Sequence, residues 1–301
     1  LSMVSGGLVS METGILITAL FAISYTVLAG MYSVVYTDVV NGILMTIGTI
    51  FALVFLIVEV GGFSEIILVS DPLGKWQIFG NWHLERTGEI SGSIIAISFF
   101  VPTMLLLMGD ANMYQRIFSA KNGGSAKKAV FFWIIGVVLL ESMISMLGLV
   151  GSVAAHKGII PDLVKDAQSG IQIFNDTALL EARQSGSESV LPAIARFAKL
   201  PLIIGLLLVS TMMAIIVSTA DSFLLIPATN LTRDVYQKHI NISATETQIL
   251  FFSRTLVIVL GIVAFLLVSQ FKTVLNAAFT AYNIYGTSIT PALLAAFLWK
   301  R

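Results

Sequence analysis

Cysteine is absent from the 301 residues, histidine occurs three times, and charged residues make up only 11% of the chain. Without cysteine there is no disulfide, no haem attachment motif and no thiolate metal site. The HExxH, GxSxG and glycine-rich phosphate-loop patterns are also missing, so we do not expect an enzyme or a bound cofactor. Basic and acidic residues number 17 each, which gives no electrostatic footprint for a nucleic acid.

Apolar residues dominate instead, at 56% of the sequence, whereas soluble proteins have about a quarter of their residues charged. This composition predicts an all-α, multi-pass membrane protein, since a helix that crosses the bilayer needs about 20 apolar residues. Seven such runs occur, at 7–29, 39–60, 92–109, 129–154, 201–229, 249–269 and 274–298. The chain opens on Leu-Ser with no signal peptide, and we expect it to be a piece of a longer polypeptide in which 1–301 form a single transmembrane domain.

Cations are concentrated in some of the connections. They are Arg116, Lys121, Lys127 and Lys128 in 110–128, Arg233 and Lys238 in 231–248, and Lys300 and Arg301 at the end. The positive-inside rule places these segments and the C-terminal end in the cytoplasm, for a protein of the plasma or bacterial inner membrane. The long segments, about 61–91 and 155–200, then lie outside. Helical spacing in 161–182 predicts an interfacial helix there, and a plain connector is the alternative.

Hydroxyl groups form a stripe inside the fifth apolar run. Thr211, Ile215, Ser218 and Ser222 are spaced by four, three and four residues, which puts them on one helix face, with Thr219 at its edge. Hydroxyl and carbonyl oxygens are ligands that a dehydrated sodium ion accepts. The alternative is that these hydroxyls bond to their own backbone or allow close helix packing.

Three of the carboxylates in or beside the apolar runs are candidate functional residues, because an acid there is costly and is by default functional. Asp221 lies in the hydroxyl-bearing run, or else near its cytoplasmic end beside a loop cation. Glu141 is in the middle of the fourth run and must be protonated or face a neighbour or a water-filled cavity, which makes it a candidate substrate contact. Asp38 follows Thr37 at the start of the second run, where a helix N-terminus alone would also favour an acid.

Two runs contain features typical of discontinuous, pore-lining helices. Pro102 lies inside the third run. The seventh run contains Tyr282, Asn283, Gly286 and Pro291 among its apolar residues, and Tyr282 and Asn283 are further candidates for the substrate pathway. The alternative is a proline kink that neighbouring helices accommodate.

Four stretches, taken in order, resemble the sodium:solute symporter family, which includes carriers for sugars, proline, pantothenate, sialic acid and iodide. They are YTVLAGMYSVVYTDVVNG at 25–42, GDANMYQRIFSAKN at 109–122, STADSFLLIPATNLTRDVYQK at 218–238 and PALLAAFLWKR at 291–301. The order and the helix boundaries match that family's motifs over nearly the whole chain.

This resemblance implies an inverted-repeat fold of five plus five helices, the LeuT-type fold, with core helices four to ten present here. It also implies a sodium site in which Ser218 and Thr219 supply side-chain ligands and Ile215 supplies a backbone carbonyl. Asp38 corresponds to the acid of the sodium path. The other half of the site would come from helices outside these residues.

The resemblance further implies sodium-coupled symport of a small organic solute, with sodium, the solute and the lipid bilayer as the partners. Sugar carriers of the family have an aromatic gate where this sequence has Leu105, Leu106 and Leu107, so a sugar is a poor candidate. Two alternatives are a transporter-like membrane sensor and a proton-coupled symporter of the same fold. A purely structural protein would give no reason for the intramembrane acids.

Overall fold

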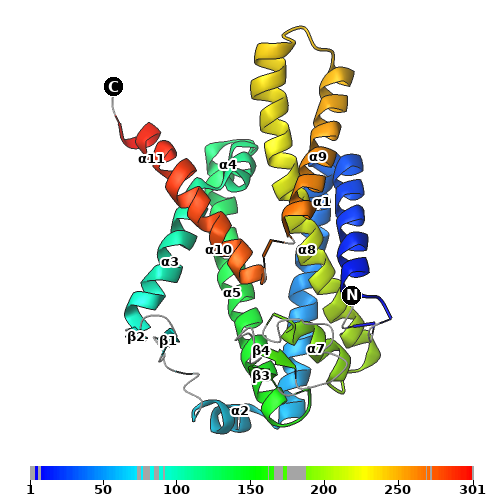
Figure 1. The fold of residues 1–301 in the computed structure, drawn as a ribbon, viewed down its shortest axis with the longest axis vertical. Helices are drawn as coiled ribbons and strands as arrows, with labels where there is room; N and C mark the ends of the chain where they lie inside the picture. Colours follow the sequence, from blue (N-terminus) through cyan, green and yellow to red (C-terminus); the bar gives the residue numbers. More distant parts are fainter. Residues whose placement is uncertain are drawn as a thin grey trace. The chain divides into compact units, whose positions relative to one another are not determined.

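Helices make up most of the structure (Figure 1). The computed structural model describes residues 4–5, 8–72, 76, 82–84, 88–90, 92–161, 163–165, 172–174, 188–268, 270–271 and 273–299. These residues fall into two units, one of Leu1–Phe63 with Val137–Ser269 and one of Ser64–Gly136 with Gln270–Arg301. Each unit is described separately. That the whole chain forms one transporter domain stays a prediction.

The first unit begins with α1, whose helical residues run from Met11 to Val60. The run does not form one straight rod, because the Tyr25 hydroxyl donates to Thr37 Oγ1 at 2.5 Å. Residues 12 positions apart in a straight helix are separated by about 18 Å along its axis. α1 therefore folds back into two arms, Glu12–Leu28 and Val34–Val60, as the two blue rods in Figure 1 show. These arms match the first two predicted helices.

Helix α8 (Leu202–Asn230) is the long central helix of this unit and packs on α1 and on α9 (Glu246–Val268). It continues without a break into the wide π-type turns of η1 (Leu231–Ile240). The connection expected at 231–248 is therefore helical over its first ten residues. Asp234 and Lys238 pair at 2.6 Å one turn apart, which supports a helix on an exposed, polar segment.

Helix α5 (Gly123–His156) contributes its second half to the first unit and ends against the short helix α7 (Val190–Phe197). Gly151 permits this approach, since a Cβ there would lie 2.5 Å from Val190 Cγ1. The core at this end consists of fully buried apolar side chains, among them Leu147, Val150, Val153, Ala154 and Ile194. The Lys157 ammonium donates to the Val60 carbonyl and fixes the end of α1 beside them.

The second unit contains α2 (Phe63–Ser70), α3 (Gly92–Gly109), α4 (Ala111–Phe118), the first half of α5, α10 (Val274–Ile284), η2 (Tyr285–Ile289) and α11 (Thr290–Leu298). The last three form one helical run. Thr290 Oγ1 donates to the Leu105 carbonyl at 2.7 Å, and Gly286 packs against the Leu105 side chain. These contacts hold α3 against the C-terminal run.

The predicted breaks at the two prolines take a different form in the structure. Pro102 lies inside an uninterrupted α3, so this helix is not discontinuous. Pro291 is at the start of α11, and the wide π-type turn of η2 precedes it. Such a turn accommodates the missing backbone donor without ending the helix.

Two short antiparallel hairpins lie in the segments predicted to be external. β1 (Trp82–Leu84) pairs with β2 (Gly88–Ile90), and β3 (Leu163–Lys165) pairs with β4 (Gln172–Phe174). The helix predicted over 161–182 was therefore wrong at the strand residues. In the second hairpin Leu163 lies opposite Phe174 and Val164 opposite Ile173, and such apolar cross-strand pairs favour strands over a helix.

Five described helical segments are long and apolar enough to cross a membrane: Val34–Val60, Ala96–Phe118, Gly123–His156, Leu202–Ile240 and Glu246–Val268. The arm Glu12–Leu28 is a shorter apolar helix, and the Val274–Leu298 run is divided by η2. The all-α membrane architecture predicted from the apolar runs is thus confirmed.

Candidate functional site

The second arm of α1 and helix α8 run antiparallel, in contact along most of their length (Figure 1). Three hydrogen bonds follow one another along α1. Asp38 accepts from the Ser218 hydroxyl, and the Leu44 carbonyl accepts from Thr211. Near the end of α1, Glu59 accepts from the backbone N–H of Lys199. The approach is closest at Gly48, where a Cβ would lie 2.0 Å from Thr211 Oγ1 and 3.1 Å from the Leu207 carbonyl oxygen. We call the hydroxyl-bearing side of α8, with its α1 partners, the polar seam.

The centre of the polar seam is a hydrogen bond between two residues singled out in the sequence. Ser218 Oγ donates to Asp38 Oδ1 at 2.5 Å, across 180 positions of the chain, and both side chains are partly buried. Asp38 lies about one turn inside the second arm of α1, which begins at Val34. A short bond to an ionised acceptor is among the stronger hydrogen bonds in proteins. The seam thus joins a carboxylate and a hydroxyl between two spanning helices.

Tyr25 is a residue of this site that the sequence analysis did not single out. Its hydroxyl donates to Thr37 Oγ1, which in turn donates to the Val34 carbonyl at 3.0 Å. Thr37 is the neighbour of Asp38, so this chain of bonds fixes the start of the second arm where Asp38 faces α8. The only signal in the sequence was that Tyr25 begins the quoted 25–42 motif. Its contact with Thr37 could not be predicted, because it forms only when α1 reverses direction.

The other predicted residues of α8 lie around Ser218. Thr211 is buried, and its Oγ1 donates to the Leu44 carbonyl at 3.1 Å, so it bonds to the neighbouring helix. Asp221 is fully buried, and its Oδ1 accepts from Ser222 Oγ at 3.3 Å. Ile215 is half-buried and Thr219 is exposed at the edge of the stripe.

The remaining predicted residues are placed away from this pair or in the other unit. The Glu141 side chain is exposed on α5. In the second unit, Tyr282 forms an edge-to-face contact with Phe279, which packs in turn on Phe99. Asn283 is exposed, and its carbonyl accepts from Thr287 Oγ1. The structure therefore brings Asp38 and Ser218 together and buries Asp221 and Ser222 on the same helix as Ser218. The roles of all the candidate site residues stay predictions.

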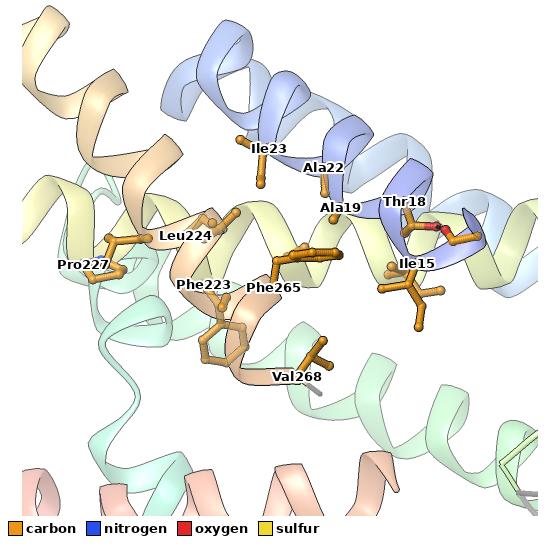
Figure 2. A pocket seen from close by; sticks show the side chains of 16 residues that line it. Ile15, Thr18, Ala19, Ala22, Ile23, Phe223, Leu224, Pro227, Phe265 and Val268 are labelled. Atoms are coloured by element: carbon orange, nitrogen blue, oxygen red, sulfur yellow. Dashed lines mark hydrogen bonds between the residues drawn. The ribbon is translucent and has the colours of Figure 1, made fainter. Parts of the chain in front are cut away.

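The opposite face of α8 borders an apolar cavity of about 670 Å³ (Figure 2). Phe223, Leu224 and Pro227 approach it from α8, Ile15 and Ile23 from the first arm of α1, and Phe265 and Val268 from α9. The hydroxyl at its rim, that of Thr18, donates to the Gly14 carbonyl at 2.8 Å. The lining residues can make apolar contacts with a bound molecule, and none of them carries a charge that could bind an ion.

The chemistry of the polar seam suits a small hard cation. A carboxylate and neighbouring hydroxyls are oxygen donors of the kind that alkali and alkaline-earth ions take, and Ser218 Oγ keeps lone pairs while its proton points to Asp38. A carboxylate also neutralises one positive charge inside the membrane-spanning part of the protein. The apolar cavity has none of these properties.

Comparison with known proteins agrees with this geometry. The family model described as "Sodium:solute symporter family" matches residues 6–301. Sodium/proline symporters of Salmonella typhimurium and Escherichia coli are 28% and 26% identical to this chain, each over 97% of it. The osmoregulated proline transporter OpuE of Bacillus subtilis is 27% identical over 96% of the chain. In all three the match covers 53% of the relative, so the chain spans about half the length of these relatives.

A solved structure supports the fold independently. A Na⁺-coupled sialic acid symporter in a substrate-bound outward-open state superposes with a TM-score of 0.73 at 19% identity, covering 95% of this chain and 56% of that one. At this identity the likeness establishes the fold, which is the inverted-repeat fold expected from the motifs. With the family model matched from residue 6 to residue 301, the chain belongs to the sodium:solute symporter family.

Proposed function

We propose that the full-length protein is a secondary active symporter that moves a small organic solute together with sodium. The observation that carries this proposal is the 2.5 Å hydrogen bond from Ser218 Oγ to Asp38 Oδ1, because it places a carboxylate and a hydroxyl between two membrane-spanning helices. Membership of the family supports it, as do the relatives named as sodium/proline symporters.

In this proposal sodium is a co-substrate bound at the polar seam. Ser218 and Thr219 offer hydroxyl oxygens, Ile215 its carbonyl, and Asp38 the compensating charge. The buried Ser222 extends the row of oxygens one turn along α8. Full coordination needs further ligands, which the rest of the full-length protein would supply at the repeat interface.

Coupling follows when the ion favours one conformation. A ligand shifts a conformational equilibrium only by as much as it binds one state better than the other. An ion that contacts both α1 and α8 is sensitive to any change in the spacing of the two helices. Sodium bound at the seam would therefore favour the outward-facing state that also binds the solute.

The solute that fits best is a small zwitterion, and proline is the first one to test. Its support is the set of proline-transporting relatives. In addition, the Leu105 side chain packs against Gly286, at the position where sugar carriers have an aromatic gate. Glu141, Asp221, Ser222, Tyr282 and Asn283 are the candidate pathway residues, and the C-terminal end of the chain would be cytoplasmic.

Uptake by the full-length protein in proteoliposomes tests the sodium site. Ser218→Ala with Thr219→Ala, and separately Asp38→Asn, should raise the sodium concentration for half-maximal proline uptake about tenfold or more, because a hydrogen bond to a charged group contributes roughly 1.5–3 kcal/mol. Asp234→Asn is the control, since its carboxylate pairs with Lys238 on an exposed surface. Unchanged sodium dependence in both seam variants would contradict the proposal.

Proton coupling is a second candidate, favoured by the complete burial of Asp221. A proton-coupled carrier would accumulate solute in sodium-free buffer when a pH gradient is imposed, and Asp221→Asn would abolish that uptake. Sodium-driven uptake that does not respond to a pH gradient would exclude it. A thermal-shift screen of amino acids, sugars, carboxylates and vitamins, with and without sodium, would identify the solute in either case.

A further inference from the structure

A second, smaller cavity of about 230 Å³ lies between α4 and the first half of α5, within the second unit. Met113 and Ile117 from α4 and Val130 and Trp133 from α5 supply its apolar lining, and Arg116 supplies a guanidinium. Asp110 also borders it. The lining of this cavity therefore combines two charged side chains and the Asn112 amide with an apolar majority.

The charge around the cavity is strongly one-sided. Between 110 and 128 there are four cations, Arg116, Lys121, Lys127 and Lys128, and one acid, Asp110. Asp110 Oδ1 accepts from the backbone N–H of Asn112 at 2.9 Å and so caps the start of α4. Lys121 follows the lining residue Ala120, and Lys127 and Lys128 lie between the lining residues Ala126 and Ala129. The segment offers an excess of positive charge to an anion.

Two of these lysines lie in the second turn of α5. α5 begins at Gly123, so Lys127 and Lys128 lie near its N-terminus, and all three lysines are exposed. The cap of α5 is Asn122, whose Oδ1 accepts from the Ser125 N–H at 2.8 Å. Asn122 thus caps α5, and Lys127 and Lys128 take no part in this cap.

An apolar surface on α5 adjoins the cavity. Phe131 and Phe132 are 60% and 67% exposed, and the aliphatic residues of the next turns of α5 are exposed as well. Trp133, at the cavity, is 45% exposed, and tryptophan is typical of the level of the lipid headgroups. A cavity bordered by a guanidinium thus has an exposed apolar surface next to it along α5.

We propose that this cavity binds an anionic phospholipid. Arg116 contacts the phosphodiester, Lys127 and Lys128 supply further positive charge, and the acyl chains lie along the exposed first half of α5. Basic pockets beside transmembrane helices bind anionic headgroups in this way. A soluble phosphate would make no contact with the exposed apolar residues of α5 beside the cavity. We therefore assign a lipid.

Native mass spectrometry of the delipidated, full-length protein tests this assignment. Dioleoyl phosphatidylglycerol should be retained at least tenfold more tightly than dioleoyl phosphatidylcholine. In Arg116→Gln/Lys127→Gln/Lys128→Gln, retention of phosphatidylglycerol should fall roughly fivefold for each cation removed, and retention of phosphatidylcholine should not change. Millimolar inorganic phosphate should not displace the phosphatidylglycerol.

Arg233→Gln is the matched control, because its exposed guanidinium donates to Gln237 on η1, outside the cavity. Lys127→Gln/Lys128→Gln, which changes exposed side chains only, is the second variant if the triple variant unfolds. Equal retention of both lipids, or equal losses in the control and in the cavity variants, would overturn the proposal. Displacement by inorganic phosphate would also overturn it, in favour of a soluble anion.

Discussion

The two faces of α8 differ in chemistry although they belong to the same helix and lie at the same depth. On one face Thr211 and Ser218 donate to the Leu44 carbonyl and the Asp38 carboxylate of the second arm of α1. On the other face Ile216, Ala220 and Phe223 border the apolar cavity. The two stripes are on opposite sides of the helix, because each residue advances the position by about 100°.

This difference shows how a membrane helix carries polar groups. Thr211 and Ser218 of the polar seam bond to α1, whereas the Thr18 hydroxyl at the cavity bonds to its own helix. A polar group that has no hydrogen-bond partner in hydrocarbon destabilises the protein by several kcal/mol. Two of the α8 hydroxyls, those of Thr211 and Ser218, therefore have their partner on another helix, and that is also where an ion could replace a bond.

Ala220→Asp should have the largest effect, because it puts a carboxylate on the face of α8 that lines the apolar cavity. The next residue, Asp221, is already an aspartate but lies off that face. The expected loss is about 3 kcal/mol of stability or membrane insertion, seen as a lower yield of monodisperse protein and a lower Tm. Ala220→Leu is the control of similar bulk and should be tolerated beside the cavity. If Ala220→Asp were as stable as Ala220→Leu, the cavity would have to contain water, and the contrast between the faces would fail.

Gly48→Ala tests how closely the seam is packed. The new methyl group would lie 2.0 Å from Thr211 Oγ1 and 3.1 Å from the Leu207 carbonyl oxygen, so α1 and α8 must separate or Thr211 must lose its bond to Leu44. Overpacking of this kind destabilises by about 1–3 kcal/mol. On the same arm a Cβ at Gly42 meets nothing within 4 Å, so Gly42→Ala should not lower the Tm. Equal Tm values for the two variants would mean that the seam is not tightly packed.

Tyr25→Phe removes the hydroxyl that fixes the reversal of α1 beside Asp38. The expected destabilisation is about 1 kcal/mol, the value of one hydrogen bond, with a severalfold rise in the sodium concentration for half-maximal uptake because Asp38 is less well positioned. Tyr36→Phe is the matched control, since Tyr36 belongs to the same helix and is 75% exposed. A change in Tm without a change in sodium dependence would show that Tyr25 serves only the fold.

The helix positions could be predicted from the sequence because apolar length is a local property. The run 92–109 coincides with α3, and 201–229 differs from α8 by one residue at each end. Polar segments were predicted less well. η1 is helical through wide turns and an Asp234–Lys238 pair, and the 161–182 stretch contains strands, because cross-strand partners lie outside any local periodicity.

The candidate site was predictable on one side only. The spacing of Thr211, Ser218 and Ser222 places them on one face whatever the rest of the chain does. The partner on α1 is 180 positions away from Ser218, and nothing in the spacing pairs the two residues. The sequence singled out Asp38 as an acid beside an apolar run, and only the family motif linked it to the sodium path. Tyr25 was missed because its role needs two arms of one helical run to meet.

Gly261→Ala should have the smallest effect and completes the comparison, because it crowds the cavity face as Gly48→Ala crowds the seam. A Cβ at Gly261 would lie 2.5 Å from Ile23 Cγ1 and 2.6 Å from Ile23 Cδ1. These atoms belong to a side chain that borders the 670 Å³ cavity, so Ile23 can rotate into open space, whereas the Leu207 carbonyl opposite Gly48 is backbone and cannot. The expected change in stability is below about 1 kcal/mol, since replacing a helical glycine by alanine also gains helix propensity. A loss of Tm equal to that of Gly48→Ala would show that the cavity is filled when the protein is in its membrane, and that both faces of α8 are packed to the same density.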